Sequence, residues 1–263
     1  MSDVLLSVRD LEITYGRGRS AFHAVRGVSF DVRHGETFGI VGESGSGKTT
    51  VGKSLVGLVK PSGGTVEFDG QQLHDRHGDV PLDARRRIQM VFQDPHSSLN
   101  PRRRVGSTLV EALTIQGIGS PSEREERAMA MLARMGFSPE HFHRFPHEFS
   151  GGQLQRIGIA RALIVSPSLV VCDEPVSALD VSIQAQILNL LSDLQDELRL
   201  SMIFISHDLS VVRHVAKRIV VMHRGEVVES GDTAEVFADP KHDYTRSLLA
   251  AVPIPDPAQR RAR

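Results

Sequence analysis

A glycine-rich turn near the N-terminus carries residue types that bind phosphate. Gly42 to Thr49 match the pattern G-x-x-x-x-G-K-[ST]. The apolar run 38–41 before the turn predicts a buried strand, and Val51, Leu55 and Leu58 after it recur at the spacing of a helix. A strand, a glycine-rich turn and a helix in this order are the context in which the pattern forms a phosphate-binding loop.

The chemistry of this loop depends on its backbone and on two side chains. Glycines let successive backbone N–H groups converge on one phosphate, and a helix N-terminus adds positive potential. Lys48 is expected to reach the β- and γ-phosphates of a nucleotide, and the Thr49 hydroxyl is expected to ligate Mg²⁺. An ordinary glycine-rich turn is the structural alternative. The predicted nucleotide-binding residues of the loop are Gly42, Glu43, Ser44, Gly45, Ser46, Gly47, Lys48, Thr49 and Thr50.

Polar residues also end three later apolar runs, each predicted to be a strand. They are Gln93, the pair Asp173 and Glu174, and His207. Ligands of α/β sheets bind beyond the carboxyl ends of the strands, so neighbouring strands would bring these side chains to one γ-phosphate. Asp173 would then hold Mg²⁺ and Glu174 would polarise the attacking water. Gln93 would contact the metal and the water, and His207 would touch the phosphate. Each also has a plainer explanation, because such carboxylates often cap helices and single histidines are usually structural.

The order of the predicted elements indicates how these residues are positioned. Alternating apolar and polar residues in 3–33 predict antiparallel strands, and helical spacing dominates from 102 to 163. Ser120 to Glu123 predict a capping box with proline at the first helical position. Beyond Pro167, short apolar strands alternate with amphipathic helices, which indicates an α/β fold with a largely parallel sheet covered on both faces. The last dozen residues predict a disordered tail.

Two further features each permit two interpretations. Tyr15 precedes the polar loop 16–19, where it could stack on a nucleobase or pack on the core at a strand end. His141, His143 and His147 share a loop with proline and phenylalanine, and their alternate spacing could form a metal site. Neither cysteines nor an ordered set of carboxylates accompany them, so their role stays open.

Composition narrows the classes of function. The chain has 263 residues, 40% of them hydrophobic, which suits either one large domain or one domain with an inserted lobe. A net charge of −1 produces no field that would favour nucleic acid, so no nucleic-acid partner is expected. Cys172 is the single cysteine, which excludes an internal disulfide and a cysteine-cluster metal site. Without a long apolar stretch or a signal-peptide pattern, the protein is expected to be soluble and cytoplasmic.

Several segments together resemble the ATP-binding-cassette (ABC) ATPases. Residues 149–156, Phe-Ser-Gly-Gly-Gln-Leu-Gln-Arg, are similar to the family's signature sequence, with Phe149 in place of the usual leucine. Gln93 matches the Q-loop, residues 177–180 the D-loop and His207 the switch histidine of that family. The resemblance covers nearly the whole chain in the family's order. It implies the P-loop NTPase fold of ABC ATPases: a largely parallel core, an antiparallel β subdomain and an inserted α-helical lobe.

The resemblance also implies a division of the chain and of the chemistry. A RecA-like core with the β subdomain would span 1–94 and 166–235, the helical lobe 95–165, and a C-terminal extension and tail 236–263, all within a single ABC ATPase domain. ATP and Mg²⁺ are the implied cofactors. Glu174, His207 and Gln93 are the implied catalytic residues, and Thr49, Gln93 and Asp173 the implied metal ligands.

The resemblance implies that ATP lies between two cassettes. Tyr15 becomes the expected adenine-stacking residue of one cassette. The other cassette would contact the nucleotide through residues of its signature sequence and D-loop. These residues are Ser150, Gly151, Gly152, Gln153 and Asp180.

A narrower resemblance points to a subfamily. Residues 92–102, 172–180 and 242–249 are similar to ATPases of dipeptide and oligopeptide importers, most of all to the second of their two ATPase subunits. The ATPases of nickel and glutathione importers contain similar sequences in many of these segments. Some relatives have a C-terminal cysteine cluster for an iron–sulfur centre, and the absence of such cysteines here excludes that cofactor.

The subfamily resemblance implies an ATP-hydrolysing motor that lies peripherally on the cytoplasmic face of the plasma membrane. Its implied partners are a homologous second ATPase subunit or a second copy, two transmembrane permeases and, indirectly, an extracytoplasmic solute-binding protein. Residues 95–104 are expected to contact a permease, with the turn 99–101 shaping part of the docking groove. A soluble ABC ATPase acting on DNA or ribosomes is the alternative from another class, but the chain lacks a long coiled-coil insertion and a tandem cassette.

Overall fold

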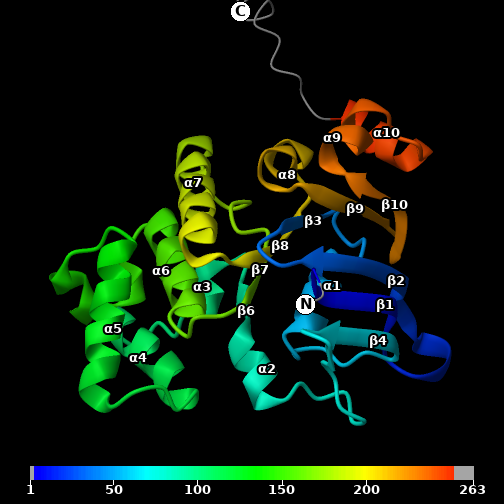
Figure 1. Cartoon of the computed structure of the whole chain (residues 1–263). Helices are drawn as coiled ribbons and strands as arrows, with labels where there is room; N and C mark the ends of the chain where they lie inside the picture. Colours follow the sequence, from blue (N-terminus) through cyan, green and yellow to red (C-terminus); the bar gives the residue numbers. More distant parts are fainter. Residues whose placement is uncertain (1–2, 252–263) are drawn as a thin grey trace, which may run out of the picture.

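A six-stranded sheet forms the centre of the computed structural model, which describes residues 3–251 (Figure 1). Its strand order is β10-β9-β3-β8-β7-β6, and all pairs are parallel except β9 with β10. Strands β3, β7 and β8 are buried along their whole length, which explains their unbroken apolar sequences and confirms the predicted parallel sheet. The strands are β3 (Thr37–Val41), β6 (Ile88–Val91), β7 (Leu169–Asp173), β8 (Ser201–Ser206), β9 (Arg218–His223) and β10 (Glu226–Asp232).

A second, antiparallel sheet has the order β2-β1-β4-β5. Val28, Phe30 and Val32 are buried on one face of β2, as their alternation with polar residues predicts. The Phe30 ring stacks on Phe38 of β3, with ring centroids 5.2 Å apart, so the two sheets share a core. The strands are β1 (Val4–Tyr15), β2 (Phe22–Arg33), β4 (Gly63–Phe68) and β5 (Gln71–Gln72), and the short 3-10 helix η1 (Gly18–Ser20) joins the first two.

Helices α3 to α6 gather in a body beside the larger sheet, coloured green in Figure 1. Ser120 caps α5 with the predicted capping box. Met135, directly after α5, is buried in the core of this body. The helices are α1 (Lys48–Leu55), α2 (Leu82–Arg87), α3 (Pro95–Ser98), α4 (Val105–Ile115), α5 (Pro121–Arg134), α6 (Gly151–Leu163), α7 (Val181–Leu198), α8 (Leu209–Val215), α9 (Thr233–Ala238) and α10 (Asp243–Ala250), with 3-10 turns η2 (Pro139–His143) and η3 (Pro146–Glu148) between α5 and α6.

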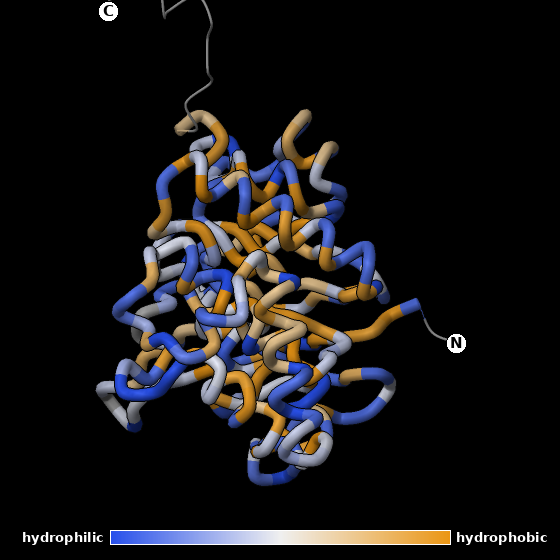
Figure 2. The backbone as a smooth tube through the Cα atoms, turned by 90° about the vertical axis from the view of Figure 1, so that its left-hand side faces the viewer, coloured by the Kyte–Doolittle hydropathy of each residue, from blue (hydrophilic) through white to orange (hydrophobic). Residues whose placement is uncertain are grey.

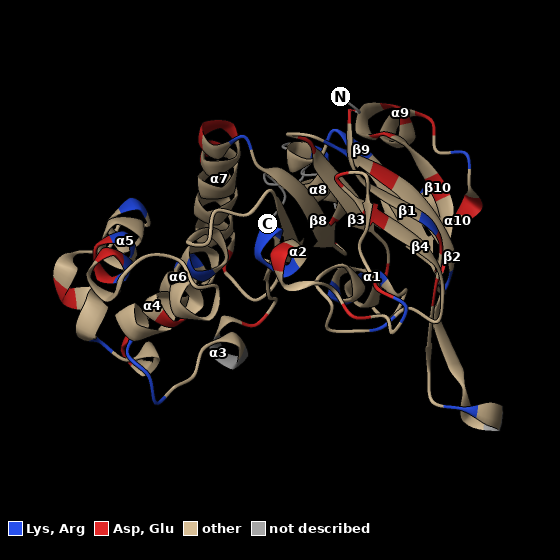
Figure 3. Cartoon of the chain, turned by 60° about the horizontal axis from the view of Figure 1, so that its bottom comes forward, with Lys and Arg blue, Asp and Glu red and all other residues tan. Residues whose placement is uncertain are grey.

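Two apolar clusters lie on opposite faces of the larger sheet. One joins the antiparallel sheet and α1 to that sheet, and the other joins it to α4 through α8. Figure 2 shows hydrophobic segments along the central strands and hydrophilic ones in the peripheral loops. Basic and acidic residues are interspersed over the elements in Figure 3. No helix within residues 3–251 has the length and apolar character needed to cross a bilayer.

The structure corrects one expectation and leaves another outside its range. Leu58 does not continue the helix that follows the phosphate loop: α1 ends at Leu55, and Leu58 is 59% exposed. Gly57 has a φ of +75°, and the Leu58 N–H donates back to Lys53 O at 2.9 Å, a glycine-dependent helix end. The tail that the sequence predicts to be disordered lies outside the described residues.

Candidate functional site: a nucleotide pocket at the strand ends

The phosphate loop is tightly enclosed by backbone from other segments. Gly42 follows β3 with a φ of +149°, and a Cβ there would lie 2.2 Å from the Met222 carbonyl oxygen. Gly47 caps α1 with a φ of +103°, and a Cβ there would lie 2.5 Å from the Ala24 carbonyl oxygen. Only glycine fits at either position without moving the neighbouring chain. The glycines therefore set the path of the loop, as the motif requires.

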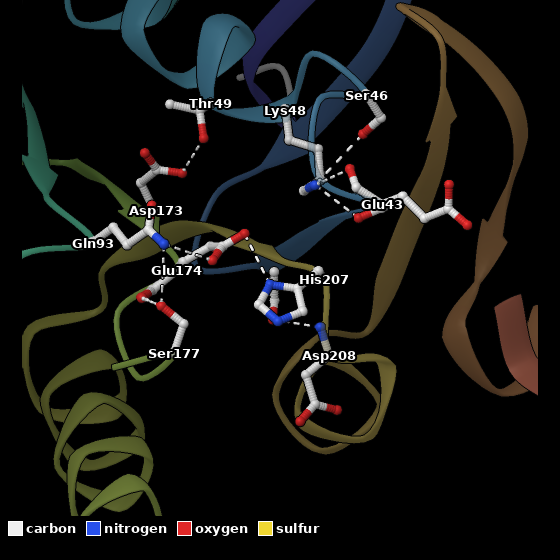
Figure 4. Close-up of polar contacts among 12 residues, drawn as sticks. Glu43, Ser46, Lys48, Thr49, Gln93, Asp173, Glu174, Ser177, His207 and Asp208 are labelled. Atoms are coloured by element: carbon white, nitrogen blue, oxygen red, sulfur yellow. Dashed lines mark hydrogen bonds and ion pairs between the residues drawn. The ribbon is translucent and has the colours of Figure 1, made fainter. Parts of the chain in front are cut away.

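Lys48 is folded back onto this loop (Figure 4). Its Nζ donates to the carbonyl oxygens of Gly42 and Glu43 at 2.7 and 2.8 Å, and the residue is 3% exposed. Burial lowers the pKa of Lys48, while the nearby Glu174 and Asp173 act in the opposite direction. The ammonium group is thus held within the loop by two neutral carbonyl acceptors, which an anionic phosphate could replace.

Thr49 and Asp173 meet between α1 and the end of β7. The Thr49 hydroxyl donates to Asp173 Oδ1 at 2.8 Å. Asp173 is 3% exposed, and this burial raises its pKa, although the hydrogen bond from Thr49 opposes the effect. A hydroxyl and a carboxylate oxygen are hard ligands of the kind that Mg²⁺ prefers, so this pair fits the ion that accompanies nucleotide phosphates.

Glu174 lies at the centre of a polar cluster formed by three strand ends (Figure 4). Gln93 Nε2 donates to Glu174 Oε2 at 3.0 Å, and His207 Nδ1 contacts Glu174 Oε1 at 3.0 Å. Gln93 also reaches Ser177 Oγ at 3.5 Å. The Glu174 backbone has a φ of +45°, unusual for a residue other than glycine, and its N–H donates to Ile205 O of β8. Strain of this kind often accompanies functional positions.

Strand order explains why these side chains converge. β3, β8, β7 and β6 are consecutive neighbours with parallel pairing, so their carboxyl ends share one edge of the sheet. The loop after β3 leads to Lys48. His207 follows β8, Glu174 follows β7 and Gln93 follows β6. All four line a cavity of about 580 Å³ at this edge.

Apolar side chains form another part of the same cavity. Tyr15 and Phe22 pair across β1 and β2, are 42% and 61% exposed, and both line it. Leu248 of α10 lines it as well. Phe22 and Leu248 are not among the site residues predicted from the sequence. The hairpin register opposite Tyr15 was a usable signal for Phe22, whereas the position of Leu248 depends wholly on how α10 packs.

The residues that match the signature sequence lie elsewhere. Ser150 caps α6, accepting from Gln153 N at 3.4 Å while its own N–H donates to Gln153 Oε1 at 2.9 Å. Gly152 packs against α7 so closely that a Cβ would lie 2.5 Å from Ile183 Cγ2. Asp180 caps α7 by accepting from Ile183 N. The residues lining the 580 Å³ cavity do not include Ser150, Gly151, Gly152, Gln153 or Asp180.

The substituted Phe149 and the histidine loop form an aromatic cluster. Phe149 is buried, with its ring centroid 5.8 Å from Phe137 and 5.6 Å from His141. His141 Nδ1 lies 2.7 Å from Ser138 Oγ, and His147 stacks on Phe145. Within residues 3–251 no group of three or more metal-ligating side chains is found. The contacts of this loop are therefore those of packing and turn formation.

The phosphate loop on a parallel sheet, with a pair of carboxylates at the end of β7, defines a P-loop nucleoside triphosphatase. Comparison with known proteins narrows the class. Residues 25–177 match the profile of the family described as ABC transporter, and residues 228–263 match that of the oligopeptide/dipeptide transporter C-terminal region. The chain belongs to the ABC transporter family, as an ATPase of that family, and ATP is its nucleotide.

Similar proteins include named peptide-transport components. The chain is 49% identical over 265 residues to the oligopeptide transport ATP-binding protein OppF of Streptococcus pyogenes serotype M1, covering 100% of this chain and 86% of that protein. It is 50% identical over 259 residues to a putative peptide import ATP-binding protein of Brucella ovis, covering 98% of this chain and 82% of that protein.

Solved structures share the fold. One is a dimeric, post-hydrolysis ATP-binding cassette bound to ADP and Pi, with a TM-score of 0.76, 30% identity, and coverage of 87% of this chain and 99% of that chain. Another is cbiO1 from Clostridium perfringens, part of an ABC transporter complex, with a TM-score of 0.78, 30% identity, and coverage of 90% and 92%. These likenesses establish the expected α/β fold of ABC ATPases.

Proposed function

We propose that this protein is the ATP-hydrolysing motor subunit of a peptide importer, bound peripherally to membrane permeases at the cytoplasmic face. The observation that supports it most is the presence, in one chain, of a strand-end nucleotide site and a C-terminal region of the oligopeptide/dipeptide transporter type. Relatives named for peptide transport match over the whole chain.

The residues around Glu174 are suited to activating water for attack on a γ-phosphate. Its two carboxylate oxygens are held by different partners, Gln93 on one side and His207 on the other. Such bracing orients a general base, since both contacts restrict its rotation. Glu174 would take a proton from the attacking water, and His207 would bind an oxygen of the γ-phosphate.

The phosphate loop supplies the electrostatic part of the mechanism. Lys48 would exchange its contacts with Gly42 O and Glu43 O for the β- and γ-phosphates. Thr49 and Asp173 would hold Mg²⁺, which when bound neutralises charge on the phosphates. Tyr15 and Phe22 would accept the adenine on their exposed faces.

Communication with a permease would pass through the segment beside Gln93. A groove of about 340 Å³ lies between β6 and α4, with Phe92, the neighbour of Gln93, in its wall. Leu58 and Ile115 line it and are 59% and 66% exposed, so a helix of a permease could bury them. The turn 99–101 is not part of this groove: Leu99 is buried in the core, and Asn100 and Pro101 are exposed but do not line it.

The site is expected to need a second cassette, either a homologous subunit or another copy. Ser150 lies at the N-terminus of α6 but outside the cavity of its own chain, so it is free to face a nucleotide held by a partner. Turnover per chain should therefore rise with protein concentration and fall for Ser150→Arg. In homodimers, mixing Lys48→Ala with Ser150→Arg should restore turnover, because one composite site of the mixed pair is intact.

Ser120→Arg is the matched control for this experiment. Ser120 caps α5 with the same capping-box geometry, so its replacement also removes a helix cap, worth about 1 kcal/mol. It does not belong to the signature-like segment. Full turnover at every concentration, or equal effects of Ser150→Arg and Ser120→Arg, would contradict the composite site.

Peptide uptake tests the transported substrate. A strain lacking this gene is expected to lose uptake of labelled di- and oligopeptides, and the wild-type gene but not Glu174→Gln is expected to restore it. The physical reason is that import against a gradient needs the hydrolysis step. Unchanged peptide uptake with loss of nickel or glutathione uptake would overturn the substrate and leave the motor function intact. Co-purification with ribosomes instead of permeases would overturn the transport function.

A further inference from the structure

Helix α10 of the C-terminal region reaches the nucleotide site at two points. The Glu43 N–H of the phosphate loop donates to Tyr244 Oη at 3.0 Å, a contact between residues 201 positions apart. One turn later along α10, Leu248 lines the nucleotide cavity together with Tyr15 and Phe22. Figure 1 shows α10 in red beside β10, far along the chain from the blue phosphate-loop segment.

Several contacts fix α10 in this position. Glu229 of β10 accepts the backbone N–H groups of Lys241 and His242 at 2.7 and 3.0 Å, just before the helix. His242 Nδ1 then caps α10 by accepting from the Tyr244 N–H at 3.1 Å. Thr245 of the helix is buried, and Tyr244, Leu248 and Leu249 are partly buried. These contacts fix the start of the helix, and the position of the helix determines where Tyr244 and Leu248 lie.

A contact of its aromatic ring also holds Tyr244 in place. The ring lies on His223 at the end of β9, with centroids 4.0 Å apart. Its hydroxyl is therefore aimed at Glu43 without needing the hydrogen bond to orient it. Burial raises the pKa of Tyr244, so the hydroxyl stays protonated at neutral pH.

Glu43 is bonded to two different parts of the molecule through its backbone. Its N–H donates to Tyr244, and its carbonyl oxygen accepts from Lys48 Nζ at 2.8 Å. When Lys48 binds a phosphate, its hydrogen bond to the Glu43 carbonyl oxygen is lost. The hydrogen bond from the Glu43 N–H to Tyr244 can persist. Tyr244 would then be the side chain that keeps the first residues of the loop in place, which lowers the ordering cost of nucleotide binding.

We propose that α10 forms part of the nucleotide site, with Tyr244 positioning the phosphate loop and Leu248 forming a wall at the nucleobase end. Nucleotide affinity would thereby depend on the C-terminal region as well as on the cassette core. Tyr244 acts through the loop and is a positioning residue, whereas Leu248 contacts the ligand. The assignment of Leu248 to the nucleobase end depends on Tyr15 and Phe22, the aromatic pair that lines the same cavity.

Tyr244→Phe isolates the hydroxyl, because the ring and its contact with His223 are kept. The full-length protein carrying this change is expected to bind ATP, ADP and tripolyphosphate about three- to tenfold more weakly, as for the loss of one neutral hydrogen bond. In turnover assays the KM for ATP should rise while kcat stays near the wild-type value, because the residues around Glu174 are untouched. A change confined to kcat would contradict a role in positioning the loop.

Leu248→Ala separates the nucleobase contact from the phosphate loop. It is expected to weaken ATP and ADP binding about three- to fivefold by loss of apolar contact, with tripolyphosphate binding unchanged. Leu249→Ala is the matched control, since Leu249 is a partly buried leucine of the same helix that does not line the cavity. ATP affinity of Leu249→Ala should equal that of the wild type.

The melting temperature of each variant without nucleotide shows whether α10 still packs. Wild-type affinity in both Tyr244→Phe and Leu248→Ala would overturn the proposal. An equal loss in Leu248→Ala and Leu249→Ala would also overturn it, because the effect would then come from helix packing and not from contact with the ligand.

Discussion

Glu174→Gln is expected to lower the rate of ATP hydrolysis by about 10²- to 10⁴-fold and to leave ATP binding intact. The amide keeps the shape of the side chain and can retain one acceptor contact to Gln93 or His207, which now bracket the carboxylate at 3.0 Å each. It cannot accept a proton from water at neutral pH. Turnover in the assembled transporter and equilibrium ATP binding by the purified chain measure the two effects separately.

Glu67→Gln is a suitable control for that experiment. Glu67 is an exposed glutamate on β4, remote from the cavity lining, and the same change of charge there should not affect turnover. ATP should also shift the association of Glu174→Gln cassettes towards the dimer, because a composite site that cannot hydrolyse its ligand stays closed. Near-normal hydrolysis by Glu174→Gln would remove Glu174 from the role of general base.

Lys48→Ala is expected to weaken ATP binding by about 100-fold or more, since each hydrogen bond to a charged group contributes about 1.5–3 kcal/mol and Lys48 would make more than one. The loss arises because the phosphate charge would face a loop without its cation. Equilibrium titration with ATP measures the effect. Hydrolysis at saturating ATP should fall as well, since the same cation stabilises charge on the transferred phosphoryl group.

Lys60→Ala provides the comparison for Lys48→Ala. Lys60 pairs with Asp79 at 2.9 Å on the surface, and its loss should leave ATP affinity unchanged. Lys48 also satisfies the carbonyl oxygens of Gly42 and Glu43, so the melting temperature of Lys48→Ala without nucleotide must be recorded beside its affinity. A folded Lys48→Ala protein with wild-type affinity would exclude Lys48 from phosphate binding.

Short-range rules made much of this site predictable. The path of residues 42–49 depends on glycine torsions and on a helix start, both of which act within a few residues. The capping box predicted at Ser120 likewise depends on a partner three positions along, and the structure shows the same arrangement at Ser150. Apolar runs identified the buried strands, because only strands covered on both faces can be apolar throughout.

Contacts between distant segments could not be obtained in this way. The sequence places Gln93 and Glu174 at strand ends, but their contact across 81 positions depends on β6 and β7 being neighbours in the sheet. Tyr244 and Leu248 enter the site only through the packing of α10 on β10, whereas Phe22 follows from its pairing with Tyr15 in the β1–β2 hairpin. Leu58 lies outside the helix predicted to contain it, because the chain leaves the helical conformation at Gly57. Local patterns determine which residues are suited to bind phosphate, whereas the burial of apolar faces in the folded chain decides which of them meet.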